Sequence, residues 1–102
     1  MPTFKNCTMD TYYRDGDLPW LDTPCEVTFD DKLITISYYD DTGKVVYTGH
    51  ELIAGVYKLK GSDNCDACLY GGPDRKVLYG GWKMPSSTIS GVWDIRLGII
   101  KE

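Results

Sequence analysis

The sequence predicts an all-β fold, a single antiparallel up-and-down meander of about seven or eight short strands that forms a closed or partly open barrel. Apolar and polar residues alternate in short runs, with the period of a strand rather than that of a helix. Turn-forming residues recur between these runs at intervals of about 8 to 12 residues. In the last third, glycine recurs beside tryptophan, in Leu78–Trp82 and again in Ser90–Leu97, which suits a strongly curved sheet.

All 102 residues are predicted to form one domain, because the length suits a single core. Residues 1–23 are expected to hold a first strand and an irregular aromatic loop, and residues 24–100 the meander. In chain order, the strands are expected at Thr3–Thr8, Cys25–Phe29, Lys32–Tyr39, Lys44–Thr48, Ala54–Lys60, Cys65–Tyr70, Lys76–Trp82 and Ser90–Ile100.

Turn chemistry sets the boundaries of the first elements. Thr11–Thr23 is predicted to be a loop, because it contains the turn signal Asp15-Gly16 and lacks a sustained period. Pro24 is expected to open the second strand, since proline is tolerated at a strand's first residue. Lys32–Tyr39 is the clearest strand, and Asp40-Asp41-Thr42-Gly43 after it is the strongest hairpin signal.

One face of the predicted strands is almost entirely apolar or aromatic. This alternation predicts an interior shared by most of the sheet. The candidate core residues are Ile34, Ile36, Tyr38, Tyr57, Leu59, Leu69, Leu78, Trp82, Trp93, Ile95 and Leu97.

Residues 45–97 carry a recurring pattern of glycine and aromatic residues. The pattern comprises Tyr47-x-Gly49, Gly55-x-Tyr57-x-Leu59, Leu78-x-Gly80-x-Trp82 and Gly91-x-Trp93-x-Ile95-x-Leu97. It resembles small lipocalin-like and avidin-like β-meanders and short bacterial β-proteins that end in such hairpins. The chain lacks the N-terminal Gly-x-Trp signature of a lipocalin. The resemblance therefore implies a fold and carries over no functional residue.

Charge and hydropathy exclude several classes of partner. Fifteen acidic residues outnumber eleven basic ones, for a net charge of −4, which disfavours nucleic acid and anionic membranes as partners. No stretch approaches the roughly 18 apolar residues of a membrane-spanning helix, and the N-terminus has no apolar signal region. We therefore expect a cytoplasmic protein, in which the four cysteines are thiols.

The cysteines allow more than one interpretation. Cys65 and Cys68 form a Cys-x-x-Cys pair that, with Cys7 and Cys25, could complete a zinc site or, alone, a redox site. A strand at this position sends Cys65 and Cys68 to opposite faces, which favours structural, metal-free thiols. A zinc-stabilised β domain stays an alternative.

The sequence marks no catalytic grouping and no cofactor site. His50 is the only histidine, and we expect it in a solvated loop after a strand, with no marked nucleophile or acid beside it. The doublets Asp30-Asp31 and Asp40-Asp41 occupy predicted turns, where aspartate is favoured without a metal. The sequence therefore predicts a protein that is not an enzyme and has no cofactor.

Two functions stay open. The first is binding of a small apolar or aromatic ligand inside the barrel, by Tyr38, Tyr57, Trp82, Trp93 and Arg96. If the barrel binds a ligand, Arg96 and Asp94 are expected to orient it at the barrel mouth. The alternative is that Arg96 and Asp94 form an exposed ion pair.

The second is a protein-interaction or inhibitor-like accessory module of a phage or other mobile element. Its acidic, tyrosine-rich surface would include Tyr12, Tyr13 and Trp20, unless these aromatic residues close one end of the sheet. A homodimer through the C-terminal edge strand, Gly98-Ile99-Ile100, is a further expectation.

Overall fold

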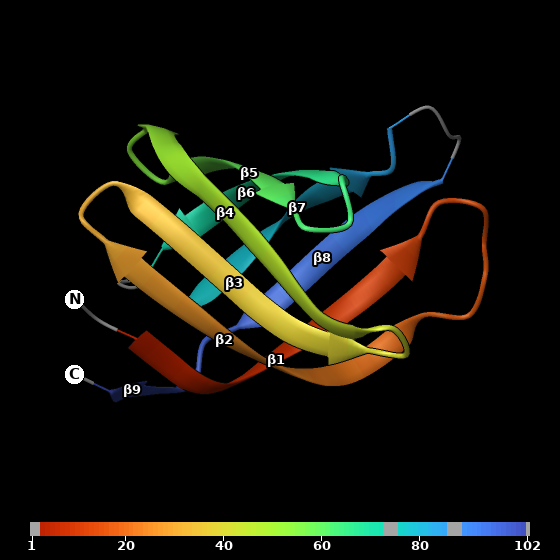
Figure 1. Ribbon diagram of the computed structural model, residues 1–102, viewed down its shortest axis with the longest axis horizontal. Coiled ribbons are helices and arrows are strands. Elements are labelled where there is room, and N and C mark those ends of the chain that lie inside the picture. Colours follow the sequence, from red (N-terminus) through yellow and green to blue (C-terminus); the bar gives the residue numbers. More distant parts are fainter. Residues whose placement is uncertain (1–2, 73–75, 86–88, 102) are drawn as a thin grey trace.

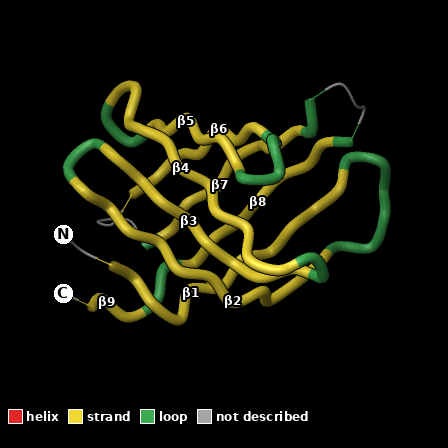
Figure 2. The backbone as a smooth tube through the Cα atoms, in the orientation of Figure 1, coloured by secondary structure: helices red, strands yellow, loops and turns green. Residues whose placement is uncertain are grey.

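The computed structural model describes residues 3–72, 76–85 and 89–101. These residues form nine strands and no helix (Figure 2). The strands are β1 (Thr3–Tyr13), β2 (Trp20–Asp30), β3 (Leu33–Asp40), β4 (Gly43–Ile53), β5 (Val56–Gly61), β6 (Asp66–Gly72), β7 (Val77–Lys83), β8 (Ser90–Arg96) and β9 (Ile99–Lys101). The predicted all-β fold class is confirmed.

Strands β1 to β8 close into an antiparallel up-and-down barrel (Figure 1). Each strand pairs with the next along the chain, and β1 also pairs with β8. Residues 8–13 of β1 pair with β8, whereas residues 3–5 pair with β9. Closure gives each of the eight strands a partner on both sides, so that no long edge is left unpaired. The predicted meander is therefore confirmed as a closed barrel.

The predicted loop Thr11–Thr23 is too long, because β1 continues to Tyr13 and β2 begins at Trp20, which leaves residues 14–19 as the loop. Pro24 lies inside β2, opposite Thr8, rather than at the start of the strand. The β1–β2 ladder is irregular at two points, and Asn6 and Asp22 adopt positive φ angles of 58° and 57° there. Each irregularity adds one residue to one strand and interrupts the alternation on which the sequence prediction depends.

Most other strand ends shift by only one or two residues, but two further elements differ more strongly from the prediction. Strand β4 runs to Ile53, well beyond Thr48. The predicted strand Ser90–Ile100 is broken, because β8 ends at Arg96 and β9 begins at Ile99. Gly98 lies so close to β1 that a Cβ atom there would be 2.2 Å from the Lys5 carbonyl oxygen. Pairing of β9 with a second copy of the chain stays a prediction, which sedimentation at micromolar concentration tests.

Alternation along the strands fills the barrel interior. All the predicted core residues are buried except Leu97, which packs partly buried against the core. Glycine makes room for the largest rings: a Cβ atom would be 2.5 Å from the Tyr47 ring if added to Gly61 and 2.9 Å from the Trp82 ring if added to Gly91. The repeated glycine beside an aromatic residue therefore lets large rings pack inside a narrow barrel.

Candidate functional site

One end of the barrel holds a chamber of about 190 Å³. This end, the mouth, is where β1, β3, β5 and β7 end, beside the 14–19 loop and the 41–42 turn (Figure 1). An outer groove of about 450 Å³ lies between Trp20 and the 41–42 turn, and it shares Tyr13, Trp20 and Asp40 with the chamber. The chamber is below the roughly 300 Å³ of a drug-sized pocket and several times the roughly 30 Å³ share of one water, so it fits a small group.

Six aromatic side chains line the chamber: Tyr13, Trp20, Tyr38, Tyr47, Trp82 and Trp93. Edge-to-face contacts join four of them in a row, with ring centroids 6.2 Å apart for Trp20 and Tyr38, 6.2 Å for Tyr38 and Trp93, and 4.8 Å for Tyr47 and Trp93. Tyr13 packs in the same way on Trp82, at 5.6 Å. Because each ring is supported by another, the walls are formed before any ligand arrives.

Two hydrogen bonds hold the Asp63 carboxylate at the mouth. The Tyr47 hydroxyl donates to Asp63 Oδ2 at 3.2 Å, and the Cys65 backbone N–H donates to Asp63 Oδ1 at 3.1 Å. Burial raises the pKa of Tyr38, and the charges of Asp63 and Asp40 raise it further. Burial and the charge of Asp63 also raise the pKa of Tyr47. Both phenols are therefore neutral in a negative electrostatic field.

Two of the residues that line the chamber carry a buried polar atom without a hydrogen-bond partner among the described residues. The two atoms are Thr11 Oγ1 and Trp82 Nε1, and both side chains are more than nine-tenths buried. A buried, unpaired donor or acceptor costs about 1–3 kcal/mol, so such atoms are uncommon and call for an explanation. A bound molecule that pairs with them would remove this cost.

The structure brings together three of the five predicted ligand-binding residues. Tyr38, Trp82 and Trp93 line the chamber. Tyr57 lies near the start of β5, at the opposite end of the barrel, where its ring packs on Phe29. The chamber therefore occupies one end of the barrel, whereas the site expected from the sequence extended through the interior to Tyr57.

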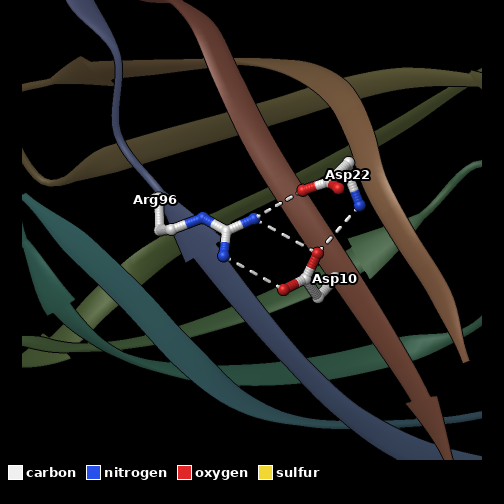
Figure 3. Close-up of polar contacts among 3 residues, drawn as sticks. All are labelled: Asp10, Asp22 and Arg96. Atoms are coloured by element: carbon white, nitrogen blue, oxygen red, sulfur yellow. Dashed lines mark hydrogen bonds and ion pairs between the residues drawn. The ribbon is translucent and has the colours of Figure 1, made fainter.

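Arg96 lies on the outer surface and bridges two aspartates (Figure 3). Its Nη1 is 3.2 Å from Asp10 Oδ2, and its Nη2 is 3.1 Å from Asp22 Oδ1. Asp10 Oδ1 also accepts the backbone N–H of Asp22 at 2.8 Å. Asp94, the partner expected from the sequence, is not the residue that Arg96 contacts in these ion pairs. The cluster holds the irregular part of β2 against β1 and β8.

The aromatic residues around the 14–19 loop divide between two surfaces. Tyr13 and Trp20 line the chamber and the groove, whereas Tyr12 is exposed on the outer face. Alternation along β1 separates Tyr12 from Tyr13. Of the proposed interaction surface, Tyr12 alone therefore faces away from the mouth.

The sulfur atoms occupy separate places. Cys65 lies just before β6 and is buried, whereas Cys68 lies on β6 and is half-buried, so the two differ in exposure although they do not share the predicted strand. Cys7 and Cys25 are direct partners across β1 and β2, and a hydrogen bond from Cys25 lowers the pKa of Cys7 to about 7. Among the residues that the structure describes, no group of three or more His, Cys, Asp or Glu side chains could hold a metal ion.

His50 is exposed on β4 rather than in a loop, because that strand extends past it. Another hollow, of about 360 Å³, lies on the outer face between Lys58, Cys68 and Lys83, where Gly81 has no side chain. Trp82 is its one aromatic lining residue, whereas the mouth has six. The mouth is therefore the better candidate for a binding site.

Sequence reasoning did not select Thr11, Asp40, Tyr47 and Asp63 as site residues. The available signal was topological, because Asp40 and Asp63 lie at or close to strand ends that an antiparallel barrel gathers at one rim, and Thr11 and Tyr47 lie a few residues inside their strands. That signal can be used only once the strand boundaries are known.

No protein-family model, curated protein or solved structure matches this chain. The resemblance to lipocalin-like meanders is therefore a resemblance of fold. Within the described residues, there is no helix of the length and apolar character needed to cross a membrane.

Proposed function

We propose that this protein is a non-enzymatic binding protein that holds a small apolar or aromatic ligand in the mouth of its barrel. The observation that carries the proposal is the chamber with six aromatic walls and two buried, unpaired polar atoms. Ligand sites are concave and mostly apolar, with a few polar groups that set orientation, and the mouth has this composition.

Tryptophan fluorescence tests this function directly, since Trp20, Trp82 and Trp93 all line the chamber. We expect some members of a library of small neutral aromatic and apolar compounds to quench or shift the emission. Replacing Tyr13, which packs on Trp82, with alanine should weaken binding roughly tenfold, because it removes a wall of the chamber.

Tyr12→Ala is the matched control, because the neighbouring tyrosine is exposed on the outer face. It should leave the affinity unchanged. Thermal melting of both variants checks that the barrel stays folded. The proposal is wrong if no compound changes the emission, or if the two variants lose affinity equally.

An interaction module is the second candidate, and the outer face of β1 and β8 favours it. Tyr12 and Val92 are partners in the sheet and are 42% and 50% exposed. Exposed apolar side chains on an acidic protein suit a partner with an apolar patch and a basic rim. Capture experiments with Tyr12→Ala and Trp20→Ala separate the candidates, because an interaction through the outer face depends on Tyr12 and not on Trp20.

A further inference from the structure

The mouth carries negative charge that no described side chain neutralises. Asp40 and Asp63 line the chamber, and Asp40 and Asp41 line the groove. The described lining residues include no lysine, arginine or histidine. The ion pairs found among the described residues involve none of these three aspartates. A cation that enters the mouth therefore meets carboxylates without a competing partner.

Asp40 and Asp63 are held in place. The Thr42 hydroxyl and backbone N–H donate to Asp40 Oδ1 at 2.6 and 2.8 Å, and these bonds hold the pKa of Asp40 below its usual value. Asp63 is oriented by Tyr47 and Cys65. Fixed carboxylates pay little reorganisation cost when a positive charge arrives.

The aromatic walls favour the same charge. The face of an aromatic ring carries partial negative charge, and a cation within about 6 Å of the ring is attracted by about 0.5–2 kcal/mol. Tyr38, Tyr47 and Trp93 line the chamber together with Asp63 and contact one another edge-to-face. Indole and phenol rings with a nearby carboxylate suit an ammonium group that is covered by apolar carbon.

The unpaired atoms of Trp82 and Thr11 indicate which hydrogen-bonding group the ligand should carry. The indole N–H of Trp82 can only donate, so its partner must be an acceptor, whereas the Thr11 hydroxyl can donate or accept. A hydroxyl group can both accept from an indole N–H and donate to another hydroxyl, so a ligand that carries one matches the hydrogen-bonding capacity of either atom.

We propose that the ligand of the mouth is a small organic cation, an ammonium compound with an apolar surface and a hydroxyl or other hydrogen-bond acceptor. This inference rests on the proposed function and names the chemical class of its ligand. The carboxylates and ring faces bind the charge, and Trp82 and Thr11 bind the acceptor. The size of the chamber restricts the inserted group to a few heavy atoms.

Calorimetric titration with choline and with dimethylbutanol, its uncharged carbon isostere, tests the charge requirement. The two probes share shape and hydroxyl group, so a difference in affinity reports the charge alone. We expect choline to bind at least roughly tenfold more tightly. The affinity for choline should also fall with ionic strength, since Asp40 and Asp63 are partly in solvent.

Asp63→Asn keeps the side-chain shape and removes the charge, and it should weaken choline binding roughly three- to tenfold. Asp94→Asn is the matched control, because it removes the same charge from the outer face of β8, next to the inward-facing Trp93. Trp82→Phe should weaken the binding of choline and not that of tetramethylammonium, which has no acceptor. Thermal melting verifies that each variant is folded.

Equal affinity for choline and its isostere, or equal losses in Asp63→Asn and Asp94→Asn, would overturn the inference. Absence of choline binding would also overturn it. In each of these cases, binding of neutral compounds from the fluorescence library would leave the proposed function in place. Failure of both sets of probes would remove both proposals.

Discussion

The two ends of the barrel are built from the same eight strands and are filled differently. The end opposite the mouth, which we call the closed end, contains Phe4, Phe29 and Tyr57. There the Phe29 ring packs edge-to-face on both Phe4 and Tyr57, with centroids 5.8 Å apart in each pair. At the mouth, six aromatic rings surround a chamber that also contains Asp40 and Asp63. The rings pack on one another at both ends, but those at the mouth also line a chamber.

The difference shows how one alternating pattern can serve stability at one end and binding at the other. Inward positions are aromatic at both ends, so hydrophobicity alone does not separate them. Carboxylates and unpaired polar atoms line the chamber and do separate the two ends, because leaving a buried polar atom unpaired costs free energy that packing does not return. The following predictions test this division, beginning with the largest effect.

Substitutions at the closed end should lower the free energy of unfolding more than substitutions at the mouth. Phe29→Ala removes a ring that is 95% buried, since 5% of its surface is exposed, and should lower the free energy of unfolding by about 3–5 kcal/mol. Trp20→Ala at the mouth, where the ring is 39% exposed, should cost less than about 1 kcal/mol. Urea denaturation measures both. Equal losses would contradict the division between the two ends.

Alkaline pH should lower the free energy of unfolding, because two tyrosines at the mouth ionise. The pKa values of Tyr38 and Tyr47 are raised above the ordinary 10.0, first by burial and then by the charge of Asp63. The unfolded chain therefore loses these protons at a lower pH than the folded chain. Stability from this source is complete below pH 10 and falls above it, by up to about 1.4 kcal/mol per pH unit for each tyrosine.

Denaturation midpoints measured between neutral pH and strongly alkaline pH check this effect. The double variant Tyr38→Phe, Tyr47→Phe lacks both hydroxyl groups and should show a flatter dependence. An unchanged slope in the double variant would show that other groups cause the loss.

Arg96 should contribute to stability and not to ligand binding. Arg96→Gln leaves Asp10, whose side chain is 8% exposed, without its cation, and we expect a loss of about 1–2 kcal/mol. This is below the cost for a fully buried pair, because Arg96 is itself 47% exposed. Lys60→Gln, which breaks the exposed pair with Asp66, is the control and should cost about 0–1 kcal/mol. Weaker ligand binding by Arg96→Gln would instead show that Arg96 contributes to the binding site, as the sequence led us to expect.

The thiols should differ in reactivity and bind no stoichiometric zinc. Cys68 is half-buried and should react first with a thiol reagent, whereas Cys7, Cys25 and Cys65 are buried and should react slowly. Four thiols should react after unfolding. Elemental analysis of protein purified without a chelator tests for metal. Near-stoichiometric zinc would contradict the separation of Cys65 from Cys68.

Alternation and turn chemistry are enough to predict most of the fold. The run from Lys32 to Tyr39 alternates without interruption and ends in a strong turn, and it forms β3 with its predicted inward face. The prediction was wrong within Thr11–Thr23, where an added residue breaks the alternation near Asp22 in β2. An added residue reverses the inward and outward faces, which the period of the sequence does not reveal.

The candidate site was only partly accessible from the sequence. The sequence marked Tyr38, Trp82 and Trp93 as large inward-facing residues, since their strands alternate regularly. It could not tell that these residues share one end of the barrel while Tyr57 lies at the other, because that depends on where each strand starts and on the register between strands.

The sequence by itself determined the all-β class, the inward set of side chains and the pairing of glycine with large rings, because these depend on local period and residue size. The tertiary structure decided which rings form a chamber, that Asp63 lies beside Tyr47, and that Arg96 bridges Asp10 and Asp22. These contacts join residues 16, 74 and 86 positions apart in the chain, and barrel closure and register bring them together.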